Sequence, residues 1–267
     1  MVLLGKPVAE NIYLKLKKDI EVLQKKHIMP TMGVILVGED PASLSYVKIK
    51  EKIAKNLGIG FKLFHLPGIV SEKEVEKLIC ELNINKYISG IIVQLPLPTD
   101  FQTEKILKQI KSEKDVDGFY GAYPAPTVQA ILEILKFYKI NINDKKIVIV
   151  GYGRLVGQPL EKMLLKLGLK PVVCDSKTAG LKAKILEADI IVTAVGVQSL
   201  IKSDMVKAGT IIIDAGNSEV AGKMVGDVDP KVYFKIKAYS PVPGGVGPVT
   251  VACLMKNVVD ATKMSTS

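Results

Sequence analysis

The chain has 267 residues and a hydrophobic content of 48%, enough for one large or two ordinary globular domains, and its apolar runs fall short of the roughly 20 residues of a membrane helix. The net charge of +10 comes from lysines spread along the chain, and aromatic residues make up only 6%, which together argue against a nucleic-acid-binding protein. Three isolated cysteines (Cys80, Cys174, Cys253) and two histidines predict buried thiols in a cytoplasmic protein, with no metal site and no Ser-His-Asp triad.

Helical and strand patterns alternate along the chain, which predicts an α/β fold with parallel sheets. In the first half, helices are expected over residues 9–25, 41–57, 71–82 and 103–110, and strands over 33–37, 60–66 and 90–95. The second of these helices has Asp40 as a favourable N-cap, Pro41 as its first residue and Gly58 just after its end.

A stretch rich in Gly, Pro and Asp over residues 112–126 predicts the boundary between two domains. Beyond it, helices are expected over 128–138 and 249–262, with another opening near 157, and strands over 147–150, 171–174, 189–194 and 210–214. Small or polar residues follow these strands. Since open parallel sheets bind ligands outside the carboxyl ends of their strands, the second half is expected to carry a binding site.

The glycine-rich turn after residues 147–150 has the strand–turn–helix order of a dinucleotide-binding unit. Gly151 and Gly153 let the backbone approach a pyrophosphate, and the helix opening near Gly157 offers unpaired N–H groups to it. The turn also contains Arg154, the only arginine of the chain, which suits a cofactor phosphate. The spacing departs from G-x-G-x-x-G, so the alternative is a tight turn without a ligand, in which Arg154 is accidental.

Three polar residues of the first half are candidates for chemistry. Tyr46 and Lys50 lie four residues apart and share one helix face. Lys50 lies near the edge of an apolar stripe that includes Ile49, and apolar surroundings lower the pKa of a lysine. Gln94 follows a buried strand and precedes a proline-rich turn. The alternative for Lys50 is an exposed lysine whose stem covers the core.

Two further segments suit a ligand or a turn equally. Asp115 and Asp117 in KDVDGF are either paired carboxylates or part of a capped turn, since Asp-Gly is a strong turn signal. Gly244 and Gly245 lie in a loop between prolines, where a flat ligand has access to the backbone. That loop also suits a helix entry with Pro248 at the first position.

Six segments occur together in a telling order: YVKIK (46–50), VQLPLP (93–98), KDVDGF (114–119), GYGRLVGQP (151–159), VGDVD (225–229) and PVPGGVGPVT (241–250). This series closely resembles that of bifunctional methylenetetrahydrofolate dehydrogenase/cyclohydrolases. The resemblance covers nearly the whole chain, and QLPLP and PGGVGP are its most specific elements. It departs from the family at Pro126-Thr127-Val128, where Pro-Cys-Thr-Pro is usual and only Thr127 is clearly retained.

The resemblance implies oxidation of 5,10-methylenetetrahydrofolate and hydrolysis of the methenyl product to 10-formyltetrahydrofolate, in one-carbon metabolism and purine biosynthesis. Lys50 would assist proton movement during hydrolysis, Gln94 would hydrogen-bond Lys50, Tyr46 would stack on the folate, and Asp117 would bind the pterin. Other residues would lie along the substrate: Val93, Leu95, Pro241, Gly244 and Gly245.

The resemblance also implies a domain organisation. A catalytic, folate-binding domain of residues 1–120 would include the C-terminal helix, 249–267, and a Rossmann-like domain would span 121–248. The second domain would bind a nicotinamide cofactor through the following residues: Gly151, Tyr152, Gly153, Arg154, Gly157, Ser176, Lys177 and Asn217. A homodimer is implied as well, with no nucleic acid or membrane partner.

The choice between NADP and NAD rests on opposing signals. Asp175 follows the first glycine by 24 residues (175 − 151), a distance at which an acid usually binds the ribose 2′-hydroxyl of NAD. Arg154, Ser176 and Lys177 together suit the 2′-phosphate of NADP, towards which the family leans. We expect NADP, with NAD as the alternative.

Two other functions stay open at this point. One is a dehydrogenase without cyclohydrolase activity, against which the presence of both Lys50 and Gln94 argues. The other is a non-catalytic module that senses a dinucleotide, which leaves the ordered motifs of the first half unexplained.

Overall fold

Two parallel sheets, one in each half of the chain, organise the computed structural model, which describes residues 1–220 and 222–266. The chain divides into two compact units. The Lys50 unit comprises Asn11–Pro126 and the segment from Val251 onward, and the glycine-loop unit comprises Met1–Glu10 and Thr127–Thr250. Both units are α/β with parallel strands, as the alternating patterns predict.

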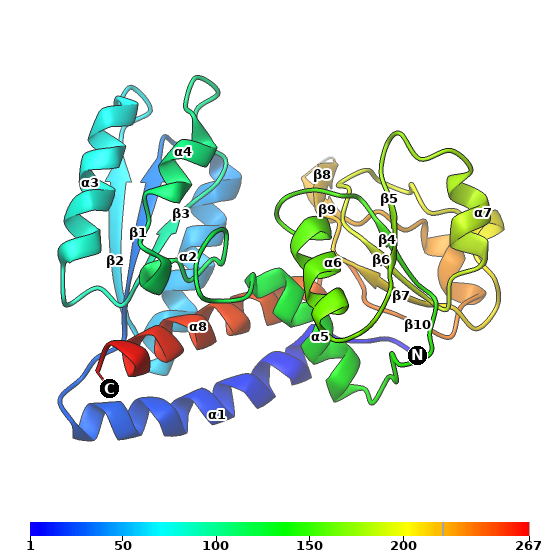
Figure 1. The fold of residues 1–267 in the computed structure, drawn as a ribbon, viewed down its shortest axis with the longest axis horizontal. Coiled ribbons are helices and arrows are strands. Elements are labelled where there is room, and N and C mark those ends of the chain that lie inside the picture. The colour runs from blue at the N-terminus through cyan, green and yellow to red at the C-terminus, as the bar shows by residue number, and fades with distance from the viewer. Residues whose placement is uncertain (221, 267) are drawn as a thin grey trace. The chain divides into compact units, whose positions relative to one another are not determined.

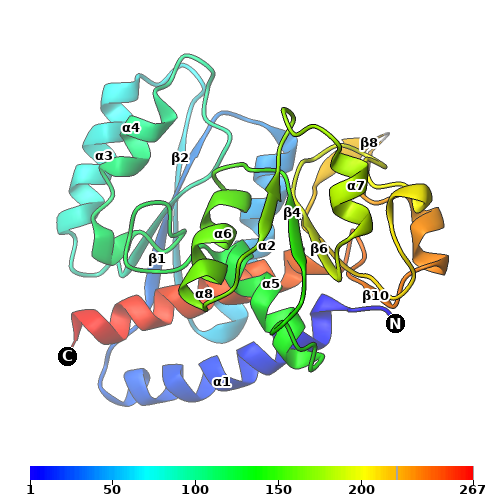
Figure 2. The ribbon, with the colours of Figure 1, turned by 45° about the vertical axis from the view of Figure 1, so that its right-hand side comes forward.

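The sheet of the Lys50 unit has the order β2-β1-β3, with strands Gly60–Leu66 (β2), Thr31–Val37 (β1) and Gly90–Val93 (β3). Every residue of β1 is buried, because this strand is central and both of its faces are covered. Helices α3 (Glu72–Ile84) and α4 (Thr103–Lys108) pack their apolar residues against one face. Helix α2 (Pro41–Leu57) lies on the other face (Figure 2).

The ends of α2 are set by local chemistry. The Asp40 carboxylate accepts the Ser43 N–H at 2.8 Å, Pro41 is the first helical residue, and Gly58 ends the helix with a φ of 79°. Each of these three residues has the role predicted from the sequence.

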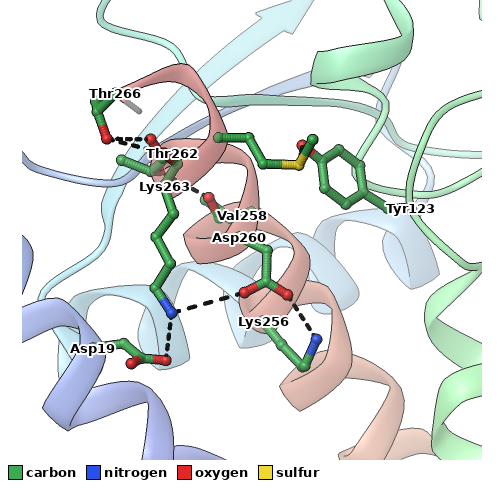
Figure 3. A network of polar contacts seen from close by, with 9 residues as sticks. Asp19, Tyr123, Lys256, Val258, Asp260, Thr262, Lys263 and Thr266 are labelled. Atoms are coloured by element: carbon green, nitrogen blue, oxygen red, sulfur yellow. Dashed lines mark hydrogen bonds and ion pairs between the residues drawn. The ribbon is translucent and has the colours of Figure 1, made fainter.

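The long C-terminal helix α8 (Val246–Ser265) brings its residues from Val251 onward back to the Lys50 unit, as the resemblance implies. There it lies beside α1 (Gly5–Lys25), and the Lys263 amine is 2.8 Å from the Asp19 carboxylate (Figure 3). Lys256 pairs with Asp260 at 2.6 Å on the same helix. Exposed pairs of this kind contribute only about 0–1 kcal/mol, so the buried apolar residues of α8 do more to hold it in place.

The sheet of the glycine-loop unit has the order β10-β7-β6-β4-β5 and is parallel throughout (Figure 1). Its strands are Ala238–Tyr239 (β10), Ile211–Asp214 (β7), Ile190–Thr193 (β6), Ile147–Val150 (β4) and Val172–Cys174 (β5). Helices α5 (Pro126–Phe137) and α6 (Gly157–Lys166) lie on the opposite side of this sheet from α7 (Leu181–Leu186). The glycine-rich turn joins β4 to α6.

Several short elements were not expected from the sequence. They are α7, β10, the hairpin of β8 (Ser218–Val220) and β9 (Lys223–Val225), and 3₁₀ turns at Ser112–Lys114, Ser203–Met205 and Pro230–Phe234. The predicted strands of three or four residues are mainly runs of apolar residues, whereas most of these unexpected segments carry neither an apolar run nor enough residues to show a period. The longer predicted elements are all present, with boundaries shifted by up to four residues.

The first ten residues group with the glycine-loop unit: the Leu3 N–H donates to the Tyr239 carbonyl at 2.8 Å, and Val2 forms a bridge with Tyr239. The structure corrects the expectation that all three cysteines are buried. Cys80 is exposed, whereas Cys174 and Cys253 are buried as expected. Cys80 follows Ile79 and so lies off the buried stripe of α3.

Candidate functional site

Lys50 occupies the middle of the buried face of α2. The buried residues of this helix are Ser43, Val47, Ala54 and Leu57. Lys50 falls between them in a 43–47–50–54–57 spacing that follows one helix face. The predicted stripe is wrong at Ile49, which is 46% exposed, because the small residues Ser43 and Ala54 rather than Ile49 face the sheet. A half-buried lysine thus interrupts a core-facing stripe.

A short chain of hydrogen bonds fixes the Lys50 amine. Its Nζ donates to Gln94 Oε1 at 3.0 Å, and Gln94 Nε2 donates to the Leu95 carbonyl at 2.7 Å. The second bond orients the amide, since only its oxygen can then face Lys50. Gln94 is 9% exposed and follows β3 directly, with its N–H donating to the Ile35 carbonyl at 2.8 Å. The amine therefore donates one N–H to Gln94. When it is neutral, its lone pair is still available to accept a proton.

Lys50 and Asp117 form an interacting pair of ionisable groups. Burial lowers the pKa of the Lys50 amine, and the Asp117 carboxylate opposes that change. Burial also raises the pKa of Asp117, against the influence of Lys50 and together with that of Asp115. Each group is thus moved towards its neutral form, the condition under which an amine accepts a proton near neutral pH.

The two carboxylates of KDVDGF have different environments. Asp115 is 1% exposed and accepts three backbone N–H groups, from Gly118 at 3.0 Å and from Tyr120 and Gly121 at 2.7 Å each. It therefore caps a turn, whereas Asp117 interacts with Lys50. The capped-turn alternative is therefore confirmed for Asp115.

Helix α8 secures the same turn from outside. Buried Asn257 donates through Nδ2 to the carbonyl of Val116 at 2.8 Å and to that of Pro124 at 3.0 Å. The backbone on both sides of the turn is thereby tied to one side chain. Sequence reasoning missed Asn257, although a polar residue within an apolar helical pattern was a usable signal.

Replacing Asp115 by asparagine should displace Asp117 and slow any reaction that depends on the Lys50 site. The amide places an NH₂ group opposite N–H donors, and leaving buried donors unsatisfied costs about 1–3 kcal/mol each. We expect the melting temperature of the Lys50 unit to fall and turnover at this site to drop at least tenfold. Thermal melts and activity assays test this, with exposed Glu113→Gln as the control; wild-type stability and activity in Asp115→Asn contradict it.

The remaining predicted residues of this unit lie close in sequence to Lys50 and Gln94. Tyr46 is one helical turn before Lys50 and is 38% exposed. Val93 is the last residue of β3 and is buried, and Leu95 is half-buried with its carbonyl holding the Gln94 amide.

The glycine-rich turn is tightly packed at Gly151 and Gly157 and open at Gly153. Gly151 has a φ of 100°, and a Cβ there would lie 2.6 Å from the Ala194 carbonyl oxygen. A Cβ on Gly157 would overlap the Gly151 carbonyl oxygen and lie 2.8 Å from Tyr152 Cα. A Cβ on Gly153 would meet nothing within 4 Å. Two glycines are thus required by the fold, and Gly153 leaves open space beside the turn.

That space adjoins the start of α6, whose N-cap Val156 provides no side-chain hydrogen bond. In the first turn of α6 the Gln158 N–H already donates to the Gly153 carbonyl at 3.1 Å and Pro159 has no N–H, so the helix start offers few donors. The open space beside Gly153 gives the room that a pyrophosphate needs. Half-buried Arg154 lies in the same turn. Tyr152 is 40% exposed, and its hydroxyl donates to Glu161 Oε2 at 2.5 Å. The residues present therefore fit a dinucleotide.

Asp175 is engaged in its own turn. Its Oδ1 accepts the Lys177 N–H and the Thr178 hydroxyl, each at 2.9 Å, and these bonds lower its pKa. The residue thus forms the turn after β5, which weakens the inference that it binds a ribose hydroxyl. Ser176 and Lys177 are exposed beside it, and exposed Asn217 follows β7.

The PGGVGP loop belongs to the glycine-loop unit. Gly244 has a φ of 104°, and its carbonyl accepts the Gly5 N–H at 2.8 Å. A Cβ on Gly245 would lie 2.6 Å from the Pro241 carbonyl oxygen, so the loop is tightly folded. Helix α8 begins at Val246, and Pro248 lies inside its first turn rather than at its first position.

Comparisons with known proteins cover the whole chain. Residues 3–117 match the model of the tetrahydrofolate dehydrogenase/cyclohydrolase catalytic domain, and residues 125–266 match that of the corresponding NAD(P)-binding domain. The bifunctional protein FolD of Exiguobacterium sibiricum is 40% identical over 271 residues, which cover 97% of this chain and 98% of the relative.

Two solved structures are similar in fold and sequence. The bifunctional methylenetetrahydrofolate dehydrogenase/cyclohydrolase FolD of Campylobacter jejuni has a TM-score of 0.95 at 39% identity, covering 99% of each chain. The Trypanosoma brucei enzyme, solved with NADP and an inhibitor, has a TM-score of 0.94 at 30% identity, covering 100% of this chain and 98% of the other. Within residues 1–220 and 222–266, no helix has both the length and the apolar character needed to cross a bilayer.

Proposed function

The chain belongs to the tetrahydrofolate dehydrogenase/cyclohydrolase family, and we propose that it catalyses both reactions of that name. It oxidises 5,10-methylenetetrahydrofolate to the 5,10-methenyl compound with NADP, and it hydrolyses that product to 10-formyltetrahydrofolate. The observation that carries this proposal is the Lys50 amine, half-buried, bonded to Gln94 and lowered in pKa.

In the hydrolysis, Lys50 acts first as a proton acceptor and then as a proton donor. Water attacks the methenyl carbon, and the neutral amine takes the proton that the water releases. The same group returns a proton to the pterin nitrogen as the bond between that nitrogen and the carbon breaks. Gln94 keeps the amine aimed, because its own amide is held by the Leu95 carbonyl. Such proton transfer typically contributes 10²–10⁴-fold to a rate.

The folate itself is held by further residues of this unit. The Asp117 carboxyl lies close enough to Lys50 for the two to alter each other's pKa, which suits it to bind the pterin beside the amine. Tyr46 presents a partly exposed ring one turn from Lys50, and Val93 and Leu95 flank Gln94. Pro241, Gly244 and Gly245 are proposed to contact the substrate from their loop.

In the oxidation, the chain supplies binding and orientation. NADP, when bound, accepts the hydride from the methylene carbon. Gly151, Gly153 and Gly157 shape the turn that receives the pyrophosphate, together with the N-terminus of α6. Arg154, Ser176 and Lys177 bind the 2′-phosphate, and Tyr152 and Asn217 complete the cofactor contacts.

The two half-reactions are best assayed apart. Preformed 5,10-methenyltetrahydrofolate should be hydrolysed without any cofactor, and 5,10-methylenetetrahydrofolate should reduce NADP. Reduction without hydrolysis would leave a monofunctional dehydrogenase. Binding of NADP with neither reaction would favour a dinucleotide-sensing module.

Hydrolysis should respond to pH through Lys50. Since the pKa of Lys50 lies below the ordinary 10.5, the neutral amine forms at lower pH, and kcat should rise to a plateau with a midpoint below 10.5. Asp117→Asn removes the charge that opposes this lowering, so the midpoint should move further down. Rate–pH curves at saturating substrate, corrected for spontaneous hydrolysis, test this, and an upward shift in Asp117→Asn is the contrary result.

NADP should be used more efficiently than NAD, and Arg154 should account for much of the preference. Arg154→Gln removes a charge-assisted contact, so we expect the KM for NADP to rise about 10–100-fold while that for NAD changes little. Steady-state kinetics with both cofactors measure this, with Lys166→Gln at the exposed end of α6 as the control. Equal efficiency of wild type with NAD and NADP at the same concentration contradicts the assignment.

The same family membership supports proposals for the domain roles and the cellular setting. We propose that residues 1–120 with the C-terminal helix carry the folate chemistry and that 121–248 bind the cofactor. We also propose a cytoplasmic homodimer that binds no nucleic acid.

A further inference from the structure

The loop after β6 shares one sheet edge with the glycine-rich turn. We call Ala194–Val197, which follow Thr193 at the carboxyl end of β6, the β6 loop. Strand β6 pairs with β4, and a Cβ on Gly151 would lie 2.6 Å from the Ala194 carbonyl oxygen and 3.0 Å from Val195 Cγ2. The β6 loop therefore packs against the turn at the edge where parallel sheets bind ligands.

The strand order indicates which part of a bound dinucleotide the β6 loop would contact. Strand β4 lies between β5 and β6 in the sheet, so the turns after β5 and β6 flank the glycine-rich turn on opposite sides. Ser176 and Lys177 follow β5, on the side proposed for the 2′-phosphate. If the pyrophosphate binds at the glycine-rich turn, the β6 loop would face the other half of the cofactor, the nicotinamide ribose and ring.

One buried carboxylate holds this loop. Asp227 is fully buried and accepts the N–H groups of Val195, Gly196 and Val197, each at 2.8 Å. It also accepts the Thr193 hydroxyl at 2.7 Å. Val195 and Val197 are 42% and 49% exposed, so burial contributes only part of what fixes the loop. Its shape depends on Asp227.

Asp227 is itself rigidly placed. Its N–H donates to Asp214 Oδ1 at 3.2 Å, and its carbonyl accepts the Ile201 N–H at 2.9 Å. A Cβ on Gly216 would overlap the Asp227 carboxylate, so glycine is needed there for the carboxylate to fit. Asp214 also accepts the N–H groups of Gly216 and Val228, at 2.9 Å and 3.1 Å. The mechanism proposed above gives neither carboxylate a role.

We propose that Asp227 is a positioning residue for the oxidation. By gathering three consecutive N–H groups, it presents Val195 and Val197 as an apolar surface against the nicotinamide half of NADP. This inference rests on the proposed function, and it assigns Asp227 no contact with cofactor or folate. Its effect is transmitted entirely through the β6 loop.

Asp227→Asn tests this with little change in volume. The amide replaces one acceptor oxygen by an NH₂ group, so either the Gly196 and Val197 N–H groups or the Thr193 and Val195 donors lose their acceptor. We expect the KM and Kd for NADP to rise at least tenfold. Hydrolysis of preformed methenyl substrate, which uses no cofactor, should stay within twofold of wild type. A merely structural loss would lower both activities together.

Two further variants make the outcome decisive. Thr210→Val removes a buried hydroxyl, bonded to the Ala188 carbonyl at 3.2 Å, at the opposite edge of the same sheet, and should leave the Kd for NADP unchanged. Gly196→Ala alters the loop and keeps the Asp227 carboxylate: the φ of 79° at this position is strained for alanine, so the Kd for NADP should rise severalfold with hydrolysis retained. If Asp227→Asn does not fold, the Kd of Gly196→Ala for NADP becomes the test of the inference.

Calorimetric titration with NADP separates this inference from the proposed function. If wild type binds NADP but converts no folate, the proposed function fails, and the Kd values of the variants still test the role of Asp227. An unchanged Kd in a folded Asp227→Asn overturns the inference, as does an unchanged Kd in Gly196→Ala when Asp227→Asn does not fold. Absence of NADP binding by wild type also overturns it.

Discussion

Lys50→Met should lower the hydrolysis rate of 5,10-methenyltetrahydrofolate by about 10²–10⁴-fold, the usual contribution of a positioned acid–base group. Methionine matches the length of the lysine stem but has no amine to exchange protons with water or the pterin. The melting temperature should not fall, since burial already disfavours the ammonium at this position. The Kd for NADP should also stay at the wild-type value, because the cofactor residues belong to the glycine-loop unit. Stopped-flow or conventional absorbance assays measure the hydrolysis.

The control and a second variant sharpen this result. Lys52→Met removes an exposed lysine from the same helix and should hydrolyse at the wild-type rate. Lys50→Arg should be as slow as Lys50→Met, because a guanidinium does not deprotonate near neutral pH. Hydrolysis at more than half the wild-type rate in Lys50→Met would remove Lys50 from the chemistry.

Gly157→Ala should impair both folding and cofactor use. The added Cβ overlaps the Gly151 carbonyl oxygen and lies 2.8 Å from Tyr152 Cα, and neither backbone atom moves without opening the turn. Overpacking of this kind typically costs about 1–3 kcal/mol, so the free energy of unfolding should fall by that amount. The displaced turn should raise the KM for NADP more than tenfold. Denaturant unfolding and NADP titrations in the oxidation assay measure the two effects.

Gly153→Ala separates the fold from the ligand at the same turn. Its Cβ meets nothing within 4 Å, so stability should stay at the wild-type value. The KM for NADP should still rise, because the methyl group occupies the space proposed for the pyrophosphate. Lys162→Ala, on the exposed face of α6, is the control for both measurements. Wild-type stability and KM in Gly157→Ala contradict this account of the turn.

The longer elements and both units of the fold could be predicted because their signals are local. Asp40, Pro41 and Gly58 specify the ends of α2 through short-range hydrogen bonds and a left-handed residue. The strand at residues 147–150 and the glycines after it predict the dinucleotide unit in the same way. Elements such as β10 pair with residues distant in sequence and are too short to show a period.

The site was predicted less completely, for reasons that differ between residues. Helix spacing and the strand end singled out Lys50 and Gln94 as candidates, and their roles came from the order of family motifs. The helix pattern alone misplaced the buried stripe by including Ile49 instead of Ser43 and Ala54. The Asp-Gly signal marked the turn that Asp115 caps, whereas Asp227 accepts N–H groups from a loop 30–32 residues earlier in the sequence. Nothing in a linear pattern distinguishes such a carboxylate from an exposed one.

The central claim is that one chain performs both folate reactions, and a single mixing experiment tests it most directly. The purified chain is mixed with 5,10-methylenetetrahydrofolate and excess NADP, and NADPH and 10-formyltetrahydrofolate are quantified over time. Our account predicts equal amounts of the two products at completion, with only a transient methenyl intermediate in wild type and a persistent one in Lys50→Met. NADPH formation with no formyl product above the enzyme-free rate, or no NADPH at all, would contradict it.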